Sequence, residues 1–246
     1  YDSIGNLVKD AQAGITDIKW SVYGKISGIT KGSPIAYSYD AAGNRVSKTV
    51  DGLTTWYVRD AQGNNLAVYD NAGSAVKWRE QQLYGSSRLG LWQPNVNVAS
   101  GDPQLAWQTV GLRQYELSNH LGNVMVTLTD KRVQHTSNTT TIDYFTPDVK
   151  TAQDYYAGGM SMPGRTYTAN GSNYRYSFNG KEDDKDITDG GQDYGARIYD
   201  KRLVRFLSVD PLSPQYPELT PYQFASNSPI ANIDLDGEEA KYFTLE

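Results

Sequence analysis

Polar and apolar residues alternate over short stretches of this chain, with the two-residue period of β-strands. Val46, Lys48 and Val50 fall on one face of such a strand, and Ser47 and Thr49 fall on the other. Neither face is purely apolar. The mixture predicts a broad, curved sheet with one wet side rather than a tightly packed sandwich.

Turn motifs of one kind separate these strands in the first hundred residues. They read YDSIGN, YDAAGN, VRDAQGN and VYDNAGS, with aspartates at positions 2, 40, 60 and 70. An aspartate at the start of a turn accepts hydrogen bonds from the amides ahead of it, and a glycine three positions on closes the loop at positive φ. We therefore predict that these motifs are hairpin tips and that Gly43 and Gly63 have positive φ.

The second part of the chain mixes further hairpins with long polar stretches. Residues 93–103 are rich in turn formers and predict a loop, whereas 114–130 repeat the hairpin pattern around SNHLGN. Residues 144–165 predict a surface excursion with a short helical turn near 149–155. The acidic, glycine-rich run at 182–193 predicts a solvated loop. We expect little helix anywhere.

Residues 194–237 combine prolines and aromatic residues with almost no helical periodicity. Five prolines fix the direction of the backbone here, and large rings supply apolar surface. This composition favours a fixed coil lying on another surface over a flexible linker. We expect Phe206, Tyr222 and Phe224 to be buried against strands from the first hundred residues or from 114–130.

Composition excludes several classes of protein. The chain has 246 residues, a net charge of −5, a pI near 5.1 and no cysteine. It has no basic cluster for nucleic acid and no apolar run of about 20 residues for insertion into a membrane. Because it begins inside a repeat and no signal peptide precedes Tyr1, we expect it to be part of a longer protein.

Several motifs resemble a known family. ARIYD, RFLSVDP, YQFASNSPI and IDLDG occur in 194–237, and SNHLGNV and YRYSFNGKE precede them. In this order and spacing they resemble the core that closes Rhs proteins, which are built from tyrosine-aspartate (YD) repeats and include polymorphic toxins and cell-surface proteins. The resemblance covers nearly the whole chain.

The resemblance implies an all-β fold in which consecutive antiparallel hairpins form a curled sheet, or part of a hollow shell, closed by a mostly irregular C-terminal core. It divides the chain into YD-type hairpin repeats (1–92), further hairpins with long polar and acidic loops (93–193), the core (194–237) and the start of a downstream segment (238–246).

The resemblance also implies candidate functions. The first is structural: part of the shell of a secreted or cell-surface bacterial protein that encloses or presents its own C-terminal extension, which is a toxin in some members. Such proteins include members exported by an outer-membrane translocon. A fold alone does not establish any of these functions.

The second candidate is self-cleavage by an aspartyl protease, in which Asp210, Asp234 and Asp236 would be catalytic and Arg205 would orient one carboxylate. The alternative, which we favour, is that these aspartates only shape turns before Pro or Gly. The sequence departs from the cleaving members after Gly237. We therefore expect Asp210 to bind backbone or arginine groups, and the chain to remain uncut there.

Other sites have weaker support. The acidic run at 182–193 lacks the spacing of a calcium loop, and His120 and His135 have no companions for zinc. We therefore expect no metal and no cofactor. A third candidate function, a carbohydrate-binding adhesin, would stack surface glycans on the five tryptophans, but such rings more often pair across strands.

Overall fold

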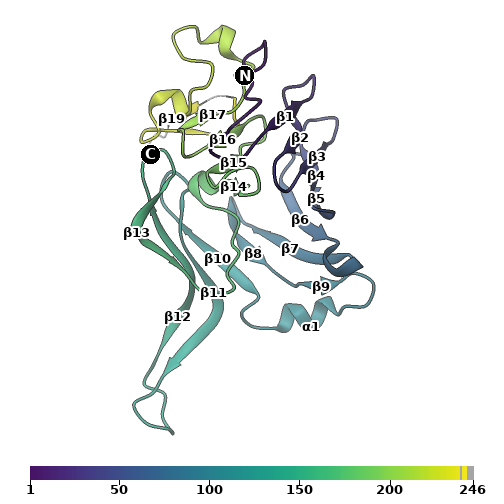
Figure 1. The fold of residues 1–246 in the computed structure, drawn as a ribbon. Helices are drawn as coiled ribbons and strands as arrows, with labels where there is room; N and C mark the ends of the chain where they lie inside the picture. Colours follow the sequence, from purple (N-terminus) through teal and green to yellow (C-terminus); the bar gives the residue numbers. More distant parts are fainter. Residues whose placement is uncertain (239, 243–246) are drawn as a thin grey trace.

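The computed structural model describes residues 1–238 and 240–242, and these form an all-β protein (Figure 1). Most strands belong to one open antiparallel sheet of 13 strands, in which strands follow one another in chain order except that β8 pairs with β10 and β9 pairs with β7. The strands are β1 (Asp17–Trp20), β2 (Ile26–Thr30), β3 (Ile35–Tyr39), β4 (Arg45–Val50), β5 (Leu53–Arg59), β6 (Asn65–Asp70), β7 (Lys77–Tyr84), β8 (Arg88–Trp92), β9 (Val96–Asn97), β10 (Arg113–Ser118), β11 (Val124–His135), β12 (Tyr144–Tyr155) and β13 (Ser161–Thr168).

A smaller part of the chain follows the large sheet. Four short strands pair in the order β14 (Glu182–Asp183), β15 (Gly191–Asp193), β16 (Ile198–Asp200) and β17 (Arg205–Phe206), and β18 (Asn232–Asp234) pairs with β19 (Ala240–Tyr242). Much of 207–231 has no regular strand. The 3-10 turns are η1 (Ala72–Ser74), η2 (Phe178–Gly180), η3 (Ser213–Gln215) and η4 (Ala225–Asn227).

The repeated turns are hairpin tips with one shared geometry, as predicted. Asp40 Oδ1 accepts the amides of Ala42 and Asn44 at 2.9 and 2.8 Å, and the Asn44 side-chain amide donates to Oδ2. Gly43 and Gly63 have φ of 82° and 87°, which confirms the prediction. The spacing of Asp, Gly and Asn therefore fixes where each strand turns back.

Replacing Gly43 by valine should lower the free energy of unfolding by about 1 kcal/mol or more, because a β-branched residue at positive φ is strained. Its added Cβ would also lie 3.2 Å from the Lys25 side chain. Urea denaturation of the variant checks this. Gly32→Val is the control. Gly32 has no positive φ and has open space around it, so this substitution should lower the free energy of unfolding by less. Equal stability of the wild type and the Gly43 variant would contradict the reading of the turn.

One expectation about the middle of the chain is wrong. Residues 144–165 do not form an excursion with a helical turn. They enter β12 and β13, and the β11–β12 hairpin extends away from the rest of the molecule (Figure 1). After the predicted loop comes a short helix, α1 (Pro103–Gln108), with Asp102 accepting the amide of Leu105 at its N-terminus.

Two hydrophobic clusters join the smaller part to the sheet. In the first, Ile187 and Leu207 pack with isoleucines of β1–β3. In the second, Phe206 and Phe224 are 1% and 3% exposed, as predicted, but they pack with rings from 178–199 and with Tyr155 rather than with the two stretches expected to receive them. Tyr222 is only half-buried, and its hydroxyl donates to the carbonyl of Gly5 at 2.6 Å.

Candidate functional site

The small sheet β14–β17 lies between two arms of the curled sheet, with β1–β6 on one side and β10–β13 on the other (Figure 1). Hydrogen bonds connect the returning segment to both arms. Lys25 donates to the carbonyl of Gly195 at 2.6 Å on the first arm, and the amide of Val124 donates to the carbonyl of Ser177 at 3.0 Å on the second. Tyr155 of β12 lies against the ring of Phe178. The chain therefore returns to the concave side of its own sheet.

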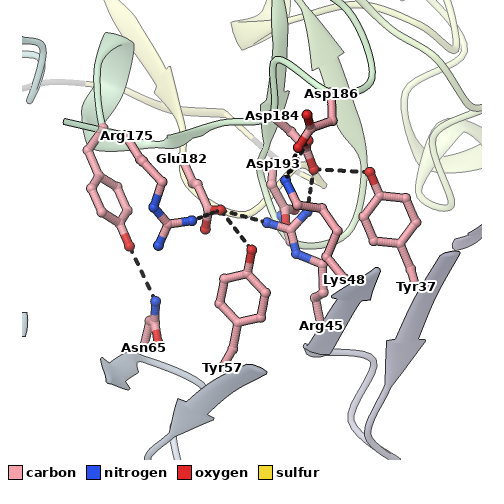
Figure 2. Close-up of polar contacts among 12 residues, drawn as sticks. Tyr37, Arg45, Lys48, Tyr57, Asn65, Arg175, Glu182, Asp184, Asp186 and Asp193 are labelled. Atoms are coloured by element: carbon pink, nitrogen blue, oxygen red, sulfur yellow. Dashed lines mark hydrogen bonds and ion pairs between the residues drawn. The ribbon is translucent and has the colours of Figure 1, made fainter. Parts of the chain in front are cut away.

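A buried ionic network centred on Arg45 fixes this position (Figure 2). Arg45 extends from β4 and is 3% exposed. Its guanidinium lies 2.7 Å from Asp184, 3.0 Å from Glu182 and 3.3 Å from Asp193, all of which belong to the returning segment. The ring of Tyr57 lies beneath the guanidinium, 4.8 Å from it. One sheet arginine thus pairs with three carboxylates of the segment 182–193.

Neighbouring side chains complete the network. Tyr37 and Tyr57 donate to Asp184 and Glu182 at 3.1 and 3.0 Å, and Lys48 Nζ lies 3.1 Å from Asp184 (Figure 2). Burial alone would raise the pKa of the Asp184 carboxyl, but Arg45 and Lys48 bring it below its usual value. The network is therefore charged, and each charge depends on a partner from another part of the chain.

The acidic run at 182–193 is consequently not a solvated loop, and that expectation is wrong. Glu182 and Asp184 are buried, and strands β14 and β15 lie within the run. Local composition cannot reveal this, because the arginine that neutralises these carboxylates is more than 130 residues away. One sequence signal could have indicated the buried network. Arg45 is the first residue of a strand, and Tyr37 and Tyr57 lie on the two neighbouring strands.

Asp210 lies at a second buried cluster, on the core itself. Its Oδ2 lies 2.8 Å from the guanidinium of Arg197, and its Oδ1 accepts the amide of Leu212 at 2.8 Å. Both members of the ion pair are buried, at 4% and 3% exposure. As expected from the sequence, Asp210 binds an arginine and a backbone amide, and it stabilises the turn that begins at Pro211.

The arginine at this cluster is not the one that the sequence suggested. Arg205 lies over the ring of Tyr222, 4.2 Å from its centre, and contributes to a surface cation–π pair. Arg197 takes the expected role from within the ARIYD motif. It lies 3.8 Å above the ring of Phe206 and also donates to the carbonyl of Gly237. Sequence reasoning chose the arginine closer along the chain to Asp210 and missed the one brought close by pairing of β16 with β17.

Asp234 and Asp236 have opposite environments. Asp234 is 1% exposed; its Oδ1 accepts the amide of Gly237 at 2.7 Å, and its Oδ2 is buried without a hydrogen-bond partner. Burial raises the pKa of Asp234 to about 6, against the opposing effects of the Gly237 amide and Arg197. Asp236 is exposed and accepts the amide of Glu238. Asp234 is therefore a buried carboxyl that keeps its proton to about pH 6.

Replacing Asp234 by asparagine should stabilise the fold above pH 6. The unfolded chain loses this proton near pH 4, whereas the folded chain keeps it to about pH 6. The wild type therefore loses stability as the pH rises between these values, by about 3 kcal/mol in total. Asparagine keeps the oxygen that accepts from Gly237 and avoids this loss. Urea denaturation at pH 4 and pH 7.5 checks it: the difference between variant and wild type should be near zero at pH 4. A constant difference would contradict the buried proton.

The described residues contain no group of three or more histidine, cysteine, aspartate or glutamate side chains placed to hold a metal ion. Among the same residues, no helix has the length and apolar character needed to cross a bilayer. The tryptophans pack mostly on one another: Trp92 lies edge-on to both Trp78 and Trp107 at 5.1 Å. Such packing favours cross-strand pairing over an open row of rings for sugar.

No protein-family model matches the chain. Among curated proteins, it is 27% identical over its full length to salivary gland surface protein 1 of Aedes aegypti, and 25% identical over 96% of its length to the tRNA3(Ser)-specific nuclease WapA of Bacillus spizizenii. It spans only 7% and 9% of these relatives.

The crystal structure of TcdB2-TccC3 has a similar fold, with a TM-score of 0.58 and 18% sequence identity over 92% of this chain and 10% of that one. At this identity the likeness establishes the fold. Together with the curated relatives, it supports the resemblance to Rhs-like proteins at low sequence identity.

Proposed function

We propose that the chain is part of the wall of a shell in a secreted or cell-surface bacterial protein, and that this shell encloses or presents a polypeptide that follows the core. One observation carries the proposal: the Arg45 network seats residues 182–193, which lead directly into the core, on the concave side of the sheet. A sheet that curls around its own C-terminal core leads the following residues out from the inner side. The curated relatives with a surface protein or nuclease name and the TcdB2-TccC3 fold support this reading.

Limited proteolysis of the intact gene product tests this proposal. If the shell encloses the polypeptide after the core, that polypeptide should be cleaved roughly tenfold more slowly than the same polypeptide expressed alone, because enclosed chain is cleaved only after opening. Equal cleavage rates would rule out enclosure. The control for protease activity is the same protein with its shell unfolded. It is digested in urea and returned to buffer only after proteolysis.

A second candidate, self-cleavage near 237–239, is favoured by the buried carboxyl of Asp234. Peptide hydrolysis needs a base that takes a proton from water and an acid that protonates the leaving amide nitrogen. Asp210, paired with Arg197, is the candidate base, and Asp234, which keeps its proton to about pH 6, is the candidate acid. Arg205 and exposed Asp236 have no part in this arrangement.

Intact mass separates the two functions. A self-cleaving protein gives two fragments, and Asp210→Asn and Asp234→Asn each give one chain. We expect the wild type to remain uncut. In this chain Glu238 follows Gly237, and at this point the sequence departs from that of the cleaving members of the family that it resembles. Two wild-type fragments that meet near residue 238, and the absence of both fragments in these variants, would establish the protease instead.

Export through an outer-membrane translocon is a further part of the proposal. It would appear as surface protein that is lost when the translocon gene is deleted.

A further inference from the structure

The successive carbonyl groups of residues 235–237, at the end of the core, each accept a hydrogen bond from an earlier part of the chain. The amide of Ala196 donates to the carbonyl of Asp236 at 2.8 Å, and Arg197 Nε donates to the carbonyl of Gly237. Both donors come from one turn of the ARIYD region. They bind backbone atoms, which every residue type presents at the same place.

Lys181 supplies the third donor, from the YRYSFNGKE region. Its Nζ donates to the carbonyl of Leu235, and its ammonium lies 5.1 Å from the centre of the Tyr194 ring. Burial lowers the pKa of Lys181, while the charges of Asp193, Asp234 and Asp236 oppose that effect. Lys181 is half-buried, and the carbonyl of Leu235 is an acceptor for its ammonium group.

The side chains of the same segment take little part in these contacts. Leu235 is 40% exposed and Asp236 is exposed as well, so both project away from the donors. Gly237 is different, because it has φ of 90° and a Cβ added there would lie 2.9 Å from the amide nitrogen of Arg197. The arrangement accepts varied side chains at 235 and 236 but requires glycine at 237.

We infer that Lys181, Ala196 and Arg197 form a peptide-backbone clamp, a binding site for a bent peptide segment that is selected by its main-chain carbonyls and by glycine at the third position. In this chain the occupant is residues 235–237. Lys181 is a positioning residue, acting through the carbonyl that it holds. The inference rests on the proposed function, since it assigns the means by which the shell fixes the start of the polypeptide that it presents.

Residue-resolved hydrogen exchange of the folded chain tests the clamp. Lys181→Met should speed exchange of the Ala196 amide and of the Gly237 amide by about tenfold or more, since a lost hydrogen bond to a charged group costs about 1.5–3 kcal/mol. Lys181→Arg should restore slow exchange. The Leu207 amide, which donates to Ile198 in the same core, should be unchanged and reports the stability of the core itself.

Two matched variants separate backbone recognition from side-chain recognition. Lys185→Met, which removes an exposed lysine of the same segment, and Leu235→Ser should both leave exchange at the two amides within about twofold of the wild type. Unchanged exchange in Lys181→Met would overturn the clamp, as would equal acceleration in Leu235→Ser. Neither result depends on proteolysis of the downstream polypeptide, so the clamp and the shell can fail separately.

Discussion

Replacing Arg45 by methionine should lower the free energy of unfolding by about 3–5 kcal/mol, which is the usual cost of removing one partner from a buried ion pair. Methionine fills much of the volume, but Asp184, Glu182 and Asp193 lose the guanidinium that pairs with all three. Lys48 also pairs with Asp186, and Arg175 also pairs with Glu80. These two cations therefore do not neutralise the three carboxylates, and excess negative charge remains between the sheet and residues 182–193.

Urea denaturation at pH 7 measures this change. Arg165→Met is the matched control, because Arg165 also pairs with a carboxylate, Asp154 at 2.7 Å, but its side chain is 66% exposed. That variant should cost less than about 1 kcal/mol. Adding Asp184→Asn to Arg45→Met should recover part of the loss, since it removes one unpaired charge. Equal costs for the two arginine variants would contradict a buried network that seats the core.

Replacing Phe224 by alanine should also lower the free energy of unfolding by about 3–5 kcal/mol, through lost apolar contact and the cavity that remains. The ring is 3% exposed, stacks on Tyr199 with centroids 4.1 Å apart and contacts Phe178, Tyr194 and Phe206 as well. It therefore joins the irregular stretch to three other parts of the core.

Phe145→Ala is the matched control, because this ring on the extended β11–β12 hairpin is 49% exposed. The same chemical change there should cost less than about 1 kcal/mol. Thermal unfolding of the two variants measures the difference. If both midpoints fall equally, the stretch around 224 is not an anchored part of the core.

Local motifs predicted the hairpins because the information lies within five residues. Asp40 accepts amides two and four positions ahead, so the turn at 40–44 forms the same way wherever it occurs. The alternation of polar and apolar residues then predicts strands between turns, and the resemblance of 194–237 to the Rhs core predicted their all-β arrangement. These parts of the fold needed no knowledge of distant contacts.

Predictions failed where distant residues decide. The strand β12 reads as an excursion because its residues are half-exposed and polar, and only pairing with β11 and β13 makes it a strand. The carboxylates at 182–184 read as solvated because Arg45 lies in another segment. Among the site residues, Asp210 bound an arginine as expected, but the arginine is Arg197, which comes close through the β16–β17 pairing.

We propose that this sheet forms the wall of a shell and that the polypeptide following the core lies on its inner side. Electron cryomicroscopy of the intact gene product tests it most directly. We expect the sheet to continue around a closed interior, residues 182–193 to be seated on Arg45 beside the core, and density for the following polypeptide to lie inside. Density for that polypeptide outside the sheet, with the concave side open to solvent, would contradict the account.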